Sequence, residues 1–118
     1  MNNFKPSRGE VWLVNLDPTI GHEQAKTRPC LVISHDNLNH SVANLHIILP
    51  MTSKNKKNPF HVPLEWLEGG SETESFILCD QIRTISRQQF KTKNLGTVTP
   101  KTLESVEYIM SILLKIYQ

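Results

Sequence analysis

The sequence predicts a mainly β domain, a small curled antiparallel sheet or open barrel with one helix laid against it at the C-terminal end. Two observations support this. Short apolar runs rich in strand-forming residues are separated by turn residues, and only the last stretch of the chain shows helical periodicity. Short strands followed by one helix pack in this way. The length of 118 residues suits one domain spanning residues 1–118.

Apolar, strand-forming runs predict the strands, and they occupy residues 10–16, 31–34, 45–49, 60–64, 75–85 and 96–98. Prolines mark several strand ends, because proline lacks the N–H that a sheet ladder needs. Pro29 is expected at the start or edge of the second strand, and Pro50 is expected to stop the third. Pro63 makes the fourth an edge strand.

The C-terminal helix is predicted from both its first residues and its periodicity. Thr99 can cap the helix, and Pro100 suits the first helical position, where its missing N–H costs nothing. Apolar residues then recur at spacings of three and four: Leu103, Val106, Ile109, Met110, Leu113, Leu114 and Tyr117. A face this wide packs on a sheet or on a partner subunit.

Composition and charge exclude several classes of protein. No apolar run approaches the roughly 20 residues that a membrane span needs, and residues 1–6 hold no apolar signal segment. We therefore expect a cytoplasmic protein, with Cys30 and Cys79 as buried, reduced thiols inside apolar runs. The net charge of +2 is too small to indicate a nucleic-acid partner by itself.

Two long polar connections, residues 17–29 and 51–59, are the candidate functional segments. The five histidines and two cysteines have no metal-ligand spacing, no glycine-rich phosphate loop follows a strand, and no G-x-S-x-G elbow occurs, so neither metal, cofactor nor serine nucleophile is expected. The first connection supplies His22, Glu23, Lys26 and Arg28, which suit acid–base chemistry at a phosphodiester. The alternative is a surface ion pair between Glu23 and Arg28.

Several motifs carry a resemblance to a known family. Residues 9–14 read G-E-V-W-L-V, residues 16–19 read L-D-P-T and residues 21–29 read G-H-E-Q-A-K-T-R-P. Later segments read L-P-M-T-S at 49–53, C-D-Q-I-R-T-I at 79–85 and G-T-V at 96–98. In this order and spacing the chain resembles the MazF/PemK/Kid toxins of bacterial type II toxin–antitoxin systems, from about residue 7 to residue 117.

The resemblance implies a fold, an activity and partners. The fold is the SH3-like small β-barrel with a C-terminal helix that CcdB, MazF and Kid toxins share, and it forms a homodimer. The activity is sequence-specific, metal-independent cleavage of single-stranded mRNA, which inhibits translation and growth. The RNA's own 2′-hydroxyl attacks, leaving 2′,3′-cyclic phosphate and 5′-hydroxyl ends, so DNA is not cut. A cognate antitoxin with an acidic, partly disordered tail neutralises the toxin, and operator DNA is bound only through that antitoxin.

The motifs also imply roles for individual residues. Arg28 and Thr52 would stabilise the phosphate, and Glu23, with His22 assisting, is a candidate base. The residues expected to contact RNA are Lys54, Lys56, Lys57, Asp80, Gln81 and Arg83, with Phe60 and Trp66 available to stack on bases.

One position departs from the pattern. In the Kid branch an arginine stands two residues before the aspartate that serves as base, whereas this chain has Leu78 before Asp80. The general base therefore stays open between Glu23, His22 and Asp80. A structural role for Asp80, as a buried carboxylate held by backbone N–H groups, is the alternative to RNA contact, and Arg83 also has a structural alternative.

Two other functions are compatible with the same fold. A gyrase poison of the CcdB type depends on a C-terminal Trp-Gly-Ile, whereas this chain ends Ile116-Tyr117-Gln118. The second alternative is a module that binds RNA or an antitoxin without cutting, which the Leu78 departure leaves open.

Overall fold

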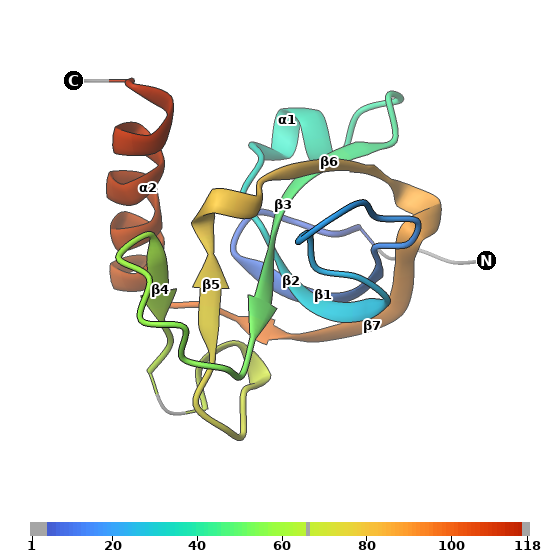
Figure 1. Ribbon diagram of the computed structural model, residues 1–118. Coiled ribbons are helices and arrows are strands. Elements are labelled where there is room, and N and C mark those ends of the chain that lie inside the picture. The colour runs from blue at the N-terminus through green and yellow to red at the C-terminus, as the bar shows by residue number, and fades with distance from the viewer. Residues whose placement is uncertain (1–4, 66, 117–118) are drawn as a thin grey trace.

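The computed structural model describes residues 5–65 and 67–116, which form a curled sheet with a helix beside it (Figure 1). The strands are β1 (Glu10–Asn15), β2 (Thr27–Val32), β3 (Leu45–Thr52), β4 (His61–Pro63), β5 (Phe76–Leu78), β6 (Arg83–Ser86) and β7 (Phe90–Thr97). The helices are α1 (Asp36–Asn39) and α2 (Pro100–Leu114), with three short 3₁₀ turns, η1 (Glu68–Gly70), η2 (Cys79–Gln81) and η3 (Arg87–Gln89).

The strands pair antiparallel in the order β4-β5-β3-β2-β1-β7, and β6 also pairs with β3. The sheet curls on itself without closing, and α2 stands beside β4 and β5 (Figure 1). The predicted mainly β fold with a C-terminal helix is confirmed. Among the described residues, no helix has the length and apolar character needed to cross a membrane.

Strand β3 is the centre of the sheet and extends past its predicted end. The prediction that Pro50 stops this strand is wrong, because β3 runs on to Thr52. On one edge β3 pairs with β6 through Ile48 and then with β5 from Met51. Pro50 lies between these two stretches, where its missing N–H interrupts neither ladder.

Other predicted boundaries also change. The run 75–85 forms two strands, β5 and β6, separated by the 3₁₀ turn η2, which redirects the chain from one part of β3 to the other. Strand β7 begins at Phe90 rather than at residue 96, and β2 begins at Thr27. Most of β7 is exposed at an edge of the sheet, so its sequence lacks the apolar alternation that reveals a half-buried strand. The four-residue helix α1 was not predicted.

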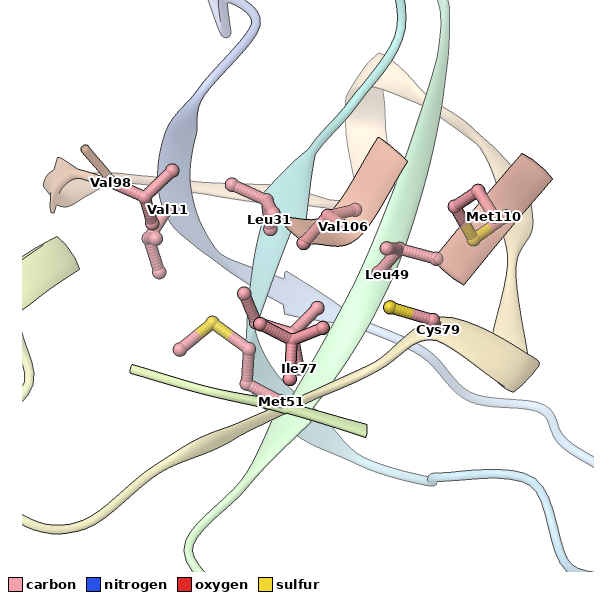
Figure 2. Packing of buried hydrophobic residues seen from close by; sticks show 10 residues of the cluster. Val11, Leu31, Leu49, Met51, Ile77, Cys79, Val98, Val106 and Met110 are labelled. Carbon is pink, nitrogen blue, oxygen red and sulfur yellow. The ribbon is translucent and has the colours of Figure 1, made fainter. Parts of the chain in front are cut away.

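Alternate residues of the central strands enter two separate cores. The first core lies between the sheet and α2; Figure 2 shows Val106 and Met110 of α2 gathered with Leu31 and Leu49. The second core fills the inside of the curl, and its members are Trp12, Val14, Leu16, Cys30, Val32, Ile48, Ile85 and Phe90. Both cysteines are buried as predicted, and burial raises the pKa of each thiol to about 12.

Helix α2 begins as its sequence predicts. The Thr99 side chain accepts a hydrogen bond of 3.2 Å from the backbone N–H of Thr102, and Pro100 is the first helical residue. The buried carboxylate of Glu68, in η1, accepts a further bond of 2.7 Å from the Thr99 N–H. The helix ends at Leu114, and Tyr117, predicted on its apolar face, lies outside the described residues.

The buried His46 of β3 makes stability depend on pH. Its side chain is fully buried, its Nδ1 lies 3.2 Å from Asn39 Oδ1, and its ring meets Phe90 edge to face at 4.8 Å. Burial lowers the pKa of His46 from 6.5 to about 4, and the nearby positive charge of Arg87 acts in the same direction. The folded protein therefore keeps His46 neutral at a pH where the unfolded chain protonates it.

We expect the free energy of unfolding to fall by roughly 3 kcal/mol between pH 7.5 and pH 4 on account of His46 alone. The loss occurs as the pH drops from 6.5 towards 4, because only the unfolded chain takes up the proton there. Urea unfolding at several pH values checks this. His46→Gln should flatten the difference and the exposed His35→Gln should not; equal pH dependence in both variants contradicts it.

Candidate functional site

The register of β2 and β3 relates two of the predicted catalytic residues, Arg28 and Thr52. Strands β2 and β3 pair as far as Cys30 and Pro50, and continuing that register by two residues places Arg28 opposite Thr52. Arg28 also pairs with Val14, whose side chain belongs to the inner core. Residues paired across strands, and alternate residues along one, share a side of the sheet. By this register, Arg28 and Thr52 belong to the side of the sheet that faces the inner core, just beyond its last members on β2 and β3.

Local contacts hold these two side chains. The Nε–H of the half-buried Arg28 donates to the Ala25 carbonyl at 3.2 Å, which leaves its terminal guanidinium nitrogens as donors. Thr52 is 6% exposed, and its Oγ1 accepts a 3.2 Å bond from the Lys54 N–H. The Thr52 hydroxyl proton remains available to an acceptor at the surface.

The 3₁₀ turn η2 links both polar connections to the sheet. The side-chain oxygen of Gln81 accepts a 2.8 Å bond from the Gln24 backbone N–H, which fastens the connection between β1 and β2. Asp80 fastens the connection between β3 and β4, since its Oδ2 lies 3.4 Å from Nδ2 of Asn58. Its Oδ1 lies 3.2 Å from Nε2 of His61, at the start of β4.

His22 and Glu23 are exposed on the first connection, next to the anchored Gln24. The bond to Gln81 thus holds the neighbouring Gln24 at η2, but no hydrogen bond or ion pair joins His22 or Glu23 to Arg28 or Thr52, all four of which the structure describes. No ion pair joins Glu23 to Arg28, both of which the structure describes, so the alternative of a surface pair is wrong.

Three exposed lysines follow Thr52 directly, on the connection to β4: Lys54, Lys56 and Lys57. The exposed Phe60 ends this connection and is available for stacking, whereas Trp66 lies outside the described residues. The buried Trp12 belongs to the inner core and is not available for stacking.

Asp80 and Arg83 each have a structural role as the alternative to RNA contact, and the structure matches that alternative only for Arg83. Asp80 is 33% exposed and is held by side chains, so the alternative of a buried carboxylate bonded to backbone N–H groups is wrong. Arg83 donates to the Leu16 carbonyl at 2.8 Å, where it supports the start of the first connection. This contact matches the structural alternative for Arg83.

Two residues of the site were not predicted, Asn58 and His61. Both reach Asp80 from a neighbouring strand and its preceding turn, and no sequence spacing reveals such a contact. His61 also pairs with Leu78 in the β4–β5 ladder, so it lies across from the position where the Kid branch has an arginine.

The site offers donors for a phosphate and a carboxylate for a proton. Arg28 and Thr52 can donate to phosphate oxygens, the three lysines add positive charge, and Asp80 exposes a carboxylate. Within residues 5–65 and 67–116, no group of three or more histidine, cysteine, aspartate or glutamate side chains is arranged to hold a metal ion.

Comparisons with known proteins identify the family of the chain. The profile of a family described as PemK-like, MazF-like toxin of type II toxin-antitoxin system matches residues 7–114. The chain is 40% identical over 99 residues to endoribonuclease PemK of Escherichia coli, covering 81% of this chain and 71% of that protein. It is 30% identical over 114 residues to endoribonuclease toxin MazF of Escherichia coli K12, covering 97% and 98% respectively.

A solved structure gives the same result for the fold. The crystal structure of MazF from Deinococcus radiodurans superposes with a TM-score of 0.86 at 29% identity, covering 97% of this chain and all of that one. The family match spans the curled sheet, η2 and α2, and therefore includes every element that positions the site. The chain belongs to the PemK-like, MazF-like toxins of type II toxin–antitoxin systems.

Proposed function

We propose that this protein is an endoribonuclease toxin that cleaves single-stranded mRNA without a metal ion and so inhibits translation and growth. The observation that carries the proposal is the register of β2 and β3, which, continued by two residues, sets Arg28 opposite Thr52 in a chain of this toxin family. The two Escherichia coli relatives are themselves named endoribonucleases.

The chemistry starts from the RNA. Its 2′-oxygen forms a bond to the adjacent phosphorus while the bond to the 5′-oxygen breaks, giving 2′,3′-cyclic phosphate and 5′-hydroxyl ends. Negative charge builds on the non-bridging oxygens, where the Arg28 guanidinium and the Thr52 hydroxyl donate hydrogen bonds. A carboxylate accepts the 2′-hydroxyl proton, and the candidates at the site are Asp80 and Glu23, with His22 beside Glu23.

The test is incubation of the purified protein with a long single-stranded RNA in EDTA, followed by mapping of the 5′ ends. Cuts at one short recurring sequence, with 5′-hydroxyl ends, support the proposal. DNA of the same sequence should stay intact because it lacks the nucleophile. Intact RNA after incubation with folded, antitoxin-free protein contradicts the proposal and favours the RNA- or antitoxin-binding module; a gyrase assay tests the CcdB-type alternative.

RNA binding by the three lysines should appear as salt dependence. In a plot of log affinity against log salt concentration, each contact between a lysine and a phosphate makes the negative slope steeper by about 0.7. We expect the triple variant Lys54→Ala, Lys56→Ala, Lys57→Ala to bind a 2′-O-methylated RNA more weakly and with a shallower slope. Lys91→Ala with Lys93→Ala, on the edge strand β7, is the control; the same slope in both variants contradicts the assignment. We propose Gln81, next to Asp80 in η2, as a further residue that contacts RNA.

The partner we propose is a cognate antitoxin with an acidic, partly disordered tail. The negative charge of such a tail suits the lysine-rich segment after Thr52, and the tail would fold on binding. The bound tail would then occupy the surface that RNA needs. Operator DNA would be bound by the antitoxin and not by this chain. Because the proposed substrate is mRNA, we propose that the protein acts in the cytoplasm.

We also propose a homodimer, formed over the groove between α2 and the sheet. This groove has a volume of about 920 Å³, and its apolar lining includes Ile33, Ile47, Ile82, Leu114 and Ile116. Burying such exposed apolar surface favours association.

Light scattering should give about 27 kDa, twice the chain mass of 13.5 kDa. We expect Leu114→Asp, at a side chain 49% exposed, to yield monomers. Leu67→Asp, at an exposed residue outside the groove, should leave the dimer intact. A monomeric wild-type protein contradicts the homodimer.

A further inference from the structure

His61 is the one histidine of the site that is buried and that contacts a carboxylate. Its side chain is only 6% exposed, whereas the Asp80 side chain it meets is 33% exposed. An ionised carboxylate can only accept hydrogen bonds, so Nε2 of His61 is the donor to Asp80 Oδ1 at 3.2 Å. The pair therefore runs from the interior beneath β4 to the surface at η2.

The other ring nitrogen of His61 is unpartnered. In the described part of the chain three buried side-chain atoms lack a hydrogen-bond partner, and these are His46 Nε2, His61 Nδ1 and Arg87 Nε. Leaving a buried polar atom unpaired costs free energy, and an apolar residue at position 61 would avoid that cost. Of the three residues, only His61 touches a residue of the candidate site.

The contacts around Asp80 fix its direction. His61 holds Oδ1, and the amide of Asn58 lies 3.4 Å from Oδ2. Asn58 belongs to the same connection as the lysines, and Gln81, the next residue after Asp80, holds the other connection. With one oxygen held by His61, the carboxylate remains 33% exposed and keeps lone pairs that can accept further hydrogen bonds.

We propose that His61 is a positioning residue that holds Asp80 as the proton acceptor for the RNA 2′-hydroxyl. This role rests on the proposed ribonuclease function and selects Asp80 among the candidate bases. The proton passes from the 2′-hydroxyl to the Asp80 carboxylate as the 2′-oxygen bonds to phosphorus. The phosphorus–oxygen bond to the 5′-oxygen breaks, and that oxygen takes a proton from water.

The test compares His61→Leu and His61→Gln on a single-stranded RNA that the wild type cleaves. Leucine fills the buried space without a donor, so we expect kcat to fall about 30-fold with KM nearly unchanged. Glutamine keeps a donor near the Nε2 position and should recover most of this loss.

A double-mutant cycle separates positioning from a structural role. In an Asp80→Asn background, His61→Leu should cause no further fall in kcat, because its partner no longer accepts the proton. The matched control is His46→Gln, which also removes a buried histidine with an unpartnered nitrogen but lies away from the site. The folded control should keep the wild-type kcat.

Two outcomes overturn different statements. If the wild type cleaves RNA and folded His61→Leu has the wild-type kcat, or if the losses in the cycle simply add, the role of His61 is wrong while the ribonuclease stands. If the wild type cleaves no RNA, the ribonuclease function is wrong, and the role of His61 is wrong with it.

Discussion

Replacement of Arg28 by alanine should lower kcat/KM for RNA cleavage by more than about 100-fold, because it removes the cation that stabilises the negative charge on the non-bridging phosphate oxygens. Arg28→Lys should restore part of the activity, since lysine keeps the charge but not the planar fork that grips two oxygens at once. Initial rates on one defined RNA, measured for each variant, check the prediction.

The fold should survive the loss of Arg28. Its side chain is only half-buried, and it is held by a 3.2 Å bond to the Ala25 carbonyl. Lys91→Ala removes the same charge from the edge strand β7 and should cleave at the wild-type rate. Cleavage by folded Arg28→Ala at the wild-type rate contradicts the placement of the phosphate at this end of the curl.

Gly70→Ala should lower the free energy of unfolding by at least about 4 kcal/mol. Gly70 ends η1 with a φ of +78°, and a Cβ there would lie 2.1 Å from the Leu95 carbonyl oxygen of β7. To relieve this clash, η1 would have to move away from β7. This movement would also displace Glu68, whose carboxylate holds the first residues of α2.

Gly21→Ala is the control for Gly70→Ala. Its φ of +66° carries a similar backbone cost, but a Cβ there meets nothing within 4 Å. Its loss should therefore be only about 1 kcal/mol. Urea unfolding of both variants separates the clash from the backbone cost, and equal losses contradict the close packing of η1 on β7.

The sequence predicts the parts of the fold that local physics determines. Thr99 and Pro100 place the start of α2, because capping and the missing proline N–H act within one turn. The prediction for Pro50 fails because whether proline ends a strand depends on which strands pair beside it. Here Pro50 lies between the stretch of β3 that pairs with β6 and the stretch that pairs with β5.

The candidate site divides in the same way. Arg28 and Thr52 are found from motifs, and the register of β2 and β3, continued by two residues, sets them opposite each other. The contact of His61 with Asp80 depends on how β4 lies beside β5, a pairing between segments about 15 residues apart in the chain that motif spacing does not reveal. The sequence shows only that Leu78 replaces the arginine of the Kid branch. The strand pairing shows that His61 lies opposite Leu78.

The attachment of the two connections to η2 has a consequence for how such toxins can diversify. Gln81 and Asp80 fasten them by side-chain bonds that belong to neither a ladder nor a core. Substitutions or changes of length within these connections therefore leave both cores packed as they are. Evolution can alter the RNA sequence recognised while the folding stability of the scaffold stays nearly constant, so new specificities arise without new folds.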